Sequence, residues 1–300
     1  MMAREKSCLV LLGLIGSAAV VTPAWACDPQ VSRVSAPRNA PYEPFAPDVA
    51  VYSLDIDIRN RDDDRCELQL VALSTSPGQR NLIGSAGGGR LAYDLTIGTG
   101  VRIPNEEAAT FGAPIVLTPK AEQTVRLQLR INPGQVVPSG HYDEQLRLRI
   151  ISKSGGVRTN ERQVPVSVQV QSRAQVNIAG TAGNCSAGVR SARLDLGSLE
   201  RGATGRMFIQ VRANEPVTLR LESLNRGRLT HVQAADQSIH YEFSVDGQRI
   251  NLAAPTILSR RPPRTLDGAA YEARTTVAPV EGRLAGEYRD VVTVSVDATG

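Results

Sequence analysis

Apolar and polar residues alternate along most of this chain, a pattern typical of β-strands with one buried face. Tyr52, Leu54, Ile56 and Ile58 form one such run. The same alternation recurs in eight further segments: Cys66 to Leu70, Leu91 to Ile97, Val125 to Ile131, Val164 to Val170, Phe208 to Val211, Val217 to Leu221, Ile239 to Val245 and Val292 to Val296. Clusters of turn-forming residues separate the runs, and no segment has the period of an amphipathic helix. The pattern predicts antiparallel β-sandwiches.

One short passage occurs twice. Ser139 to Glu144 reads Ser-Gly-His-Tyr-Asp-Glu, Ala285 to Asp290 reads Ala-Gly-Glu-Tyr-Arg-Asp, and an alternating run follows each. After the first copy comes a further run, Val164 to Val170, whereas the second copy is followed only by the end of the sequence at Gly300. If the copies mark equivalent strands in two similar domains, we expect the C-terminal domain to lack its last strand. An open apolar sheet edge is a template for pairing with another chain.

The chain therefore reads as two sandwiches in tandem. The small-residue stretch Ala179 to Asn184 follows Ile178 and is the predicted boundary, beyond which Leu194, Leu196 and Leu199 are expected to begin a second set of strands. We predict an all-β fold of two immunoglobulin-like sandwiches, residues 27–178 and 179–300. The predicted strand-acceptor edge of the second is formed by Val292, Val294 and Val296. A strand that buries four or five aliphatic side chains contributes roughly 6 to 15 kcal/mol, about the whole net stability of a domain.

The first 26 residues resemble a secretory signal peptide. Arg4 and Lys6 precede an apolar run from Cys8 to Val21, and Ala24-Trp25-Ala26 forms a small-residue cleavage site. The apolar run is shorter than the roughly 20 residues that a membrane-spanning helix needs, although a lipoprotein attached at Cys27 is an alternative. Export predicts transit through the periplasm to the cell surface and an oxidising compartment.

In such a compartment, Cys27 and Cys66 are the natural disulfide. Closing a loop of roughly 40 residues would contribute about 4 kcal/mol in the chain-entropy model. Cys185 would then be unpaired, and an odd cysteine in a secreted protein is a residue to follow.

Motifs for catalysis, cofactors or metals are weak in this sequence. The glycine run Gly84 to Gly89 lacks the lysine and spacing of a phosphate loop and predicts a hairpin tip. Asp55, Asp57 and Asp62 to Asp64 do not match a calcium loop, because Arg59 and Asn60 stand where an oxygen ligand and a glycine are needed. The three histidines have no serine or cysteine elbow beside them. We therefore expect no enzyme activity, no catalytic residue, no cofactor and no metal site.

The formal net charge is +4, and the sequence shows no basic face. It therefore gives no indication of nucleic-acid binding.

Two further groups of residues carry predictions. Tyr142 and Tyr288 are expected to join a loop to a strand in the manner of a tyrosine corner. A binding surface would lie on loops at one end of the N-terminal sandwich, and the candidate adhesive residues are Leu82, Ile83, Val101, Ile103 and Phe111.

The C-terminal half resembles a known family. "AGEYRDVVTVSV" is similar to the close of the spore coat protein U domain, with "LDLGSL" at Leu194 to Leu199 and "YEFSVDG" at Tyr241 to Gly247 in the expected upstream places. In the N-terminal copy, Asp143 stands one place earlier than Asp290. The resemblance implies a subunit of archaic, Csu-type chaperone–usher fimbriae, with an incomplete immunoglobulin-like domain. Its implied partners are a periplasmic chaperone, an outer-membrane usher and an adjacent pilin that donates a strand.

The resemblance also implies a place in the fibre. Shaft pilins carry a donor segment before their first cysteine, whereas Cys27 directly follows the predicted cleavage site, so we expect a two-domain tip adhesin for an unknown receptor. The family's domain disulfide would need a partner for Cys185 near Phe208 to Arg212, where none is present. Two alternatives stay open: a self-contained secreted β-sandwich that binds carbohydrate or a surface, and a fimbrial chaperone, for which Val164 to Val170 would be the donor strand.

Overall fold

The chain folds as strands joined by turns and loops. The computed structural model describes residues 27–35, 41–75, 78–85, 88–98, 100–103, 105, 115–152, 159–179 and 191–299. Within these ranges every regular element is a β-strand, which confirms the predicted all-β class, and no helix among them could span a membrane. The predicted signal peptide, Phe111 and Cys185 lie outside the described residues.

The first sandwich packs two antiparallel sheets around a core that runs from Cys27 to Val170. One sheet has the order β1-β2-β9-β6-β7, and the other has the order β5-β4-β10-β3-β8 with β11 paired to β10. The strands are β1 (Pro29–Ser35), β2 (Ala50–Asn60), β3 (Cys66–Leu73), β4 (Asn81–Gly84), β5 (Arg90–Ala92), β6 (Asp94–Ile97), β7 (Val101–Arg102), β8 (Ile115–Leu117), β9 (Glu122–Ile131), β10 (Gly140–Ser152) and β11 (Thr159–Val170).

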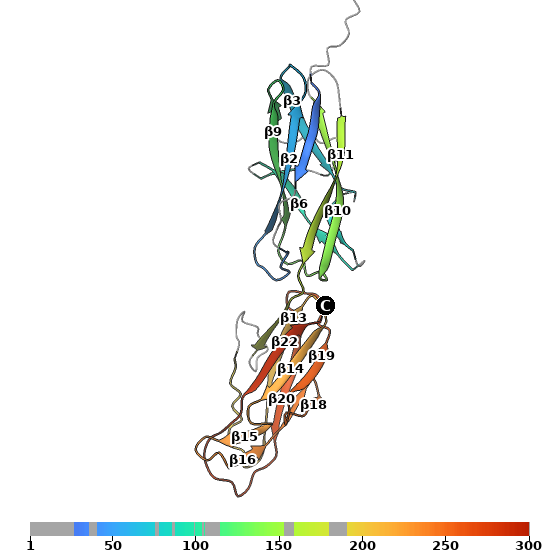
Figure 1. Ribbon diagram of the computed structural model, residues 1–300. Coiled ribbons are helices and arrows are strands. Elements are labelled where there is room, and N and C mark those ends of the chain that lie inside the picture. Colours follow the sequence, from blue (N-terminus) through green and yellow to red (C-terminus); the bar gives the residue numbers. More distant parts are fainter. Residues whose placement is uncertain are drawn as a thin grey trace, which may run out of the picture.

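The second sandwich has its own core, built from residues between Ile209 and Val277. Its sheets have the orders β12-β13-β20-β17-β18, β19-β14-β22 and β16-β15-β21. The strands are β12 (Ala174–Ala179), β13 (Ala203–Ala213), β14 (Val217–Ser223), β15 (Arg228–His231), β16 (Ser238–His240), β17 (Glu242–Val245), β18 (Gln248–Ile250), β19 (Thr256–Arg260), β20 (Ala269–Val277), β21 (Tyr288–Arg289) and β22 (Val292–Ala298). Figure 1 shows the two sandwiches end to end.

The two sandwiches repeat one plan in the same chain order. β12, β13, β20, β17 and β18 take the places of β1, β2, β9, β6 and β7. In the other layer, β14, β15, β16 and β19 match β3, β4, β5 and β8, and β21 and β22 together match β10. The residue pairing agrees as well, because Leu148 pairs with Ala72 and Val294 pairs with Leu221 at corresponding places. Among the described strands, β11 is the one without a counterpart.

In each sandwich a carboxylate two residues after the repeated tyrosine gathers several hydrogen bonds; it is buried in the first sandwich and partly buried in the second. In the first, Glu144 accepts hydrogen bonds from the hydroxyls of Tyr93 and Ser74 and from the backbone N–H of Thr75. In the second, Asp290 accepts the corresponding bonds from Tyr241 Oη and Ser223 Oγ, both at 2.6 Å, and from Asn225 N at 2.9 Å. The tyrosine and the serine match in the two sets, and the backbone donor lies one residue after the serine in the first and two residues after it in the second. Glu144 is therefore the counterpart of Asp290, and Asp143 stands one place before it, as the sequence comparison indicates.

These tyrosines also correct the predicted strands. The alternating runs Leu91 to Ile97 and Ile239 to Val245 are each two strands in different sheets, with Tyr93 and Tyr241 at the crossing points. Alternation continues through the crossing because each tyrosine is itself buried, at 4% exposure. The polar and apolar pattern records which face is buried but not the sheet to which a residue belongs.

The boundary between the sandwiches lies earlier than predicted. β12 pairs with β13 from Ala174↔Ala213 to Ala179↔Phe208, and its apolar residues pack on the second core. The change from one core to the other therefore falls between Val170 and Ala174, not after Ile178. The rest of the predicted boundary stretch, from position 180 to Asn184, lies outside the described residues.

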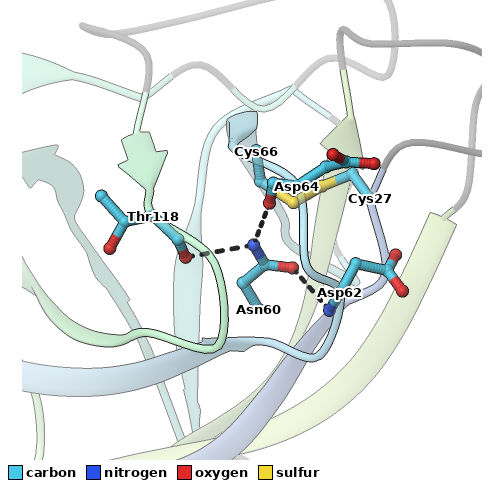
Figure 2. Close-up of a disulfide and its surroundings, with 6 residues drawn as sticks. All are labelled: Cys27, Asn60, Asp62, Asp64, Cys66 and Thr118. Atoms are coloured by element: carbon cyan, nitrogen blue, oxygen red, sulfur yellow. Dashed lines mark hydrogen bonds between the residues drawn. A yellow bond between two sulfur atoms is a disulfide. The ribbon is translucent and has the colours of Figure 1, made fainter.

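The end of the first sandwich away from the second carries the predicted disulfide, Cys27–Cys66 (Figure 2). Beside it, the fully buried Asn60 closes the turn between β2 and β3. Its Nδ2 donates to Asp64 O at 2.7 Å and Thr118 O at 3.1 Å, and its Oδ1 accepts from Asp62 N at 3.0 Å. A disulfide at this place fits a protein that folds in an oxidising compartment.

We predict that both sandwiches lose stability at alkaline pH through their buried tyrosines. Burial, and then the bond to Glu144 or Asp290, raises the pKa of Tyr93 and Tyr241 above the usual 10.0. Since the unfolded chain ionises at the usual value, the stabilisation is complete below pH 10.0 and is lost as the pH rises further. Urea unfolding between pH 7 and pH 11, approximately the useful range for tyrosine titration, should show this decline. Tyr93→Phe and Tyr241→Phe should reduce this decline. If the free energy of unfolding depends on pH in both variants as it does in the wild type, the buried tyrosines are not its cause.

Candidate functional site

The candidate site is defined by what β11 does in the first sandwich. β11 runs antiparallel to β10, paired continuously from Gly140↔Val170 to Ile151↔Thr159. Its residues Val164, Val168 and Val170 are at most 3% exposed. Val164 and Val168 lie opposite Leu146 and Tyr142 of β10, which are at most 1% exposed. A strand from the same chain therefore closes the first core.

In the second sandwich the same place is an open groove with a volume of about 1760 Å³. Its walls are β12 and β22, and its floor includes Met207, Ile209 and Phe243. Among the described strands, β22 pairs with β14 alone and β12 with β13 alone, so each has one edge that faces the groove. The groove therefore combines an apolar floor with two sheet edges, and an incoming strand needs both.

The predicted acceptor residues lie on the inner face of β22. Val292, Val294 and Val296 are partly buried and alternate with the exposed Thr293, Ser295 and Asp297. All three valines line the groove and pack on the second core. Their counterparts Leu146, Leu148 and Ile150 lie on β10, which is paired with β11, and are fully buried. The valines thus retain exposed apolar surface that an added strand would cover, and burial of such surface is favourable.

Leu194, Leu196 and Leu199 form no strand, which corrects the prediction. Residues 191–199 are irregular and run along the groove as part of its lining. We call this segment the strap. A Cβ atom on Gly205 of β13 would lie 2.7 Å from Leu196 Cδ2 and 2.9 Å from Leu194 Cδ1. Because residue 205 is glycine, the side chains of Leu194 and Leu196 can pack against β13 at this place. The alternation of the leucines therefore reflects this packing.

The second copy of the repeated passage, Ala285 to Asp290, lines the groove at the end where β22 begins. Tyr288 Oη donates to Leu284 O at 2.8 Å, as Tyr142 Oη donates to Pro138 O at 2.9 Å, so both tyrosines bond four residues back as a tyrosine corner does. A Cβ on Gly286, where φ is +149°, would lie 2.1 Å from His231 Nε2. The passage therefore needs glycine before its tyrosine.

Charged side chains bridge the groove at this end. Arg193 of the strap contacts Glu287 at 3.3 Å, and Arg289 Nε donates to Glu287 at 2.7 Å. The bond from Arg289 is the main reason that the pKa of Glu287 lies below its usual value. All three side chains are substantially exposed, so the cluster orients the strap more than it stabilises the domain.

The candidate adhesive residues do not form one surface. Leu82 and Ile103 are at most 1% exposed and belong to the first core, which rules them out as contact residues. Ile83 and Val101 are 42% and 45% exposed, and Phe111 lies outside the described residues. Gly89 lies against Pro138 and Tyr142, beside Ser139, which bonds to Glu215 of the second sandwich. Gly88 and Gly89, the described end of the glycine run, thus lie near the junction between the sandwiches.

The part of the chain that the structure describes contains no group of three His, Cys, Asp or Glu side chains placed to hold a metal. Asp55 forms an ion pair with Arg126 at 2.7 Å, and Asp57 accepts a hydrogen bond from Thr124. Sequence reasoning missed the Glu144 and Asp290 carboxylates and the strap. The spacing Tyr-x-Glu and Tyr-x-Asp in the two copies is the signal that could have revealed the carboxylates.

No protein-family model and no curated protein matches this chain. Among solved structures it is similar to a chain of the chaperone–tip adhesion subunit pre-assembly complex of archaic chaperone–usher Csu pili from Acinetobacter baumannii. That match has 14% identity over 78% of this chain and 85% of that one, with a TM-score of 0.42.

Two fimbrial adhesins are also similar. The CupB6 tip adhesin from Pseudomonas aeruginosa matches with 11% identity over 90% of this chain and 94% of that one, with a TM-score of 0.34. CfaE, the adhesive subunit of CFA/I fimbria of enterotoxigenic Escherichia coli, matches with 12% identity over 78% and 82%, with a TM-score of 0.36. We draw no functional conclusion from similarities this distant.

We predict that a side chain at Gly205 displaces the strap. Gly205→Ala places a methyl group against Leu194 and Leu196, and crowding of this kind costs about 1 to 3 kcal/mol. Hydrogen exchange at residues 194–199 should accelerate and the second sandwich should lose about 1 kcal/mol of stability. Arg206→Ala, the next position on β13, is the control. Unchanged exchange in Gly205→Ala would show that the leucines do not depend on the glycine.

Proposed function

We propose that this protein is a fimbrial subunit whose C-terminal sandwich binds a strand from another protein in the groove between β12 and β22. The observation that carries the proposal is the one-to-one match of the sandwiches with β11 left over. The first sandwich contains a last strand in cis, and the second has an open groove at the same place. The proposal involves binding and no catalytic step.

The internal repeat also specifies how the strand would lie. Val164, Val166, Val168 and Val170 of β11 pair with Leu146, Glu144, Tyr142 and Gly140 of β10. The corresponding partners in the second sandwich are Val292, Asp290, Tyr288 and Gly286. We therefore expect a donor antiparallel to β22, with apolar residues opposite these four positions. Beyond Val292 the donor can be polar, as β11 is at Arg162 opposite Leu148.

The energy of such binding is comparable with the stability of the domain. Four aliphatic side chains buried at roughly 1.5 to 3 kcal/mol each contribute about 6 to 12 kcal/mol. A whole domain has a net stability of about 5 to 15 kcal/mol. Pairing also satisfies backbone groups on the two edges that face the groove. The second sandwich should therefore depend on its partner for stability.

Partners of three kinds follow from this proposal. A periplasmic chaperone would fill the groove during export, an outer-membrane usher would accept the complex, and an adjacent pilin would supply the final strand at the cell surface. The proposed position of the subunit at the tip of the fibre is inferred from the first sandwich. β1 pairs with β2 inside its own domain and Cys27 is held in the disulfide, so the described N-terminal residues are not available as a donor.

We predict that a strand fused in cis stabilises the second sandwich. The fusion adds a hairpin linker and a second copy of residues 159–170 after Gly300, because an antiparallel donor begins where β22 ends. Burial of its four valines should raise the free energy of unfolding of this sandwich by about 6 kcal/mol or more. Thermal and urea unfolding of the full chain with and without the fusion measure the change.

The matched control carries the same fusion with serine in place of the added copies of Val166 and Val168. It preserves the length and the backbone pairing capacity but loses apolar burial. Equal stability in the fusion, the control and the unmodified chain would refute the proposal and would favour a self-contained binding protein. Val292→Asp in the chain with the valine fusion should remove much of the gain, because Val292 corresponds to Leu146, the partner of Val164.

A further inference from the structure

A single buried asparagine stands at the junction of the two sandwiches. Asn214 lies between β13 and β14 and is fully buried. Its Nδ2 donates to Val137 O at 3.1 Å, in the first sandwich, and to Gln171 O at 2.8 Å, directly after β11. Gln171 is itself held to the first sandwich, because its N–H donates to Tyr42 O at 3.2 Å. Its Oδ1 accepts from Arg173 N at 2.8 Å, in the segment that joins β11 to β12. Both polar atoms of this side chain are therefore bonded at the junction, and the Nδ2 bonds reach the first sandwich and the segment that follows it.

Asn214 is the counterpart of Asn60 in the internal repeat. Both are fully buried and follow matching strands, since β2 ends at Asn60 and β13 ends one residue before Asn214. Asn60 Nδ2 also donates to two carbonyl groups, but these are Asp64 O and Thr118 O of its own sandwich (Figure 2). The same side chain thus closes a loop in one sandwich and connects two sandwiches in the other.

Neighbouring residues support the connection from both sides. Ser139 N, in the first sandwich, donates to Glu215 Oε1 at 2.6 Å. Arg264 Nε, in the second, donates to Asn214 O at 2.8 Å, and its Nη2 lies 3.8 Å from Glu215. Arg173 is held by two hydrogen bonds to Glu43 of the first sandwich, at 2.6 and 2.5 Å. The junction is therefore polar and directional, which favours one orientation over many.

We propose that Asn214 is a positioning residue that holds the two sandwiches in one fixed orientation. Apolar contact alone would leave the junction free to swivel, because domain interfaces within a chain are small and permit motion by default. Hydrogen bonds at fixed angles from one buried amide to the carbonyl groups of Val137 and Gln171 remove that freedom. This inference goes beyond the proposed function and does not depend on it.

The fixed orientation links the groove to the far end of the first sandwich. β12 begins directly after Arg173, and Thr299, which follows β22, donates to Pro216 O at 2.8 Å. Both groove walls therefore end at the junction. β2 and β9 run from Ala50↔Ile131 near the junction to Arg59↔Glu122 at the other end, where Asn60 and the disulfide lie. A surface at that end is then presented in a constant direction relative to whatever fills the groove.

The test measures the distance between the sandwiches. Spin labels are attached to Gln163→Cys on β11 and Ser259→Cys on β19, in a Cys185→Ser background, and the distance distribution is recorded by double electron–electron resonance. Measurements use the full chain, with and without the fused strand, so that failure of the fusion leaves the junction testable. The wild-type chain should give a single narrow distribution.

Asn214→Asp replaces the donating amide with an oxygen that faces two carbonyl groups, and the width of the distribution should at least double. Asn60→Asp is the matched control, because it loses two equivalent bonds within one sandwich and should leave the width unchanged. If Asn214→Asp does not fold, Arg264→Ala and Glu215→Ala remove the supporting bonds from more exposed positions and should also broaden the distribution. A broad wild-type distribution, or junction variants as narrow as the wild type, would overturn the inference.

Discussion

A β-sandwich can bury its core only if the gap between the first strand of one sheet and the last strand of the other is covered. Any strand that covers it must satisfy backbone N–H and C=O groups and bring apolar side chains to the core at every second residue. In the first sandwich β11 meets both needs, and the residues beneath it on β10 are fully buried. In the second, β22 and β12 face an open groove and the matching valines are only partly buried. The stability of this half therefore depends on what enters the groove.

The repeated carboxylate shows which residues of the two sandwiches occupy equivalent places. Glu144 and Asp290 each gather a tyrosine from a strand that crosses between sheets, a serine at the end of the neighbouring strand and a backbone N–H beyond it. A buried carboxylate without such donors would be strongly destabilising, so all the partners have to be present together. This constraint fixes the register of β22 against β14, and with it the positions at which a donor would meet the groove.

The sequence was sufficient to predict the all-β class, the repeat, the disulfide and the tyrosine corners. Alternation reports burial, so β2, β9 and β11 could be recognised from it directly. It could not separate β5 from β6 or β16 from β17, because the buried Tyr93 and Tyr241 continue the pattern through a change of sheet. It also misplaced Leu82 and Ile103, since an apolar residue near a turn looks the same whether it covers its own core or projects into solvent. The strap was read as a strand because its leucines alternate, although their spacing reflects the absence of a side chain at Gly205.

The junction shows a different limit of sequence reasoning. Asn60 and Asn214 are the same residue type at the same place in the repeat, and nothing adjacent to either one distinguishes their partners. What differs is the set of partners that the tandem arrangement supplies: Asn60 bonds to carbonyl groups of its own sandwich, whereas Asn214 bonds to the carbonyl groups of Val137 and Gln171. The same buried amide at the same place in the repeat therefore closes a loop within one sandwich and connects two sandwiches in the other, because its hydrogen-bonding capacity is met by whichever carbonyl groups lie opposite it.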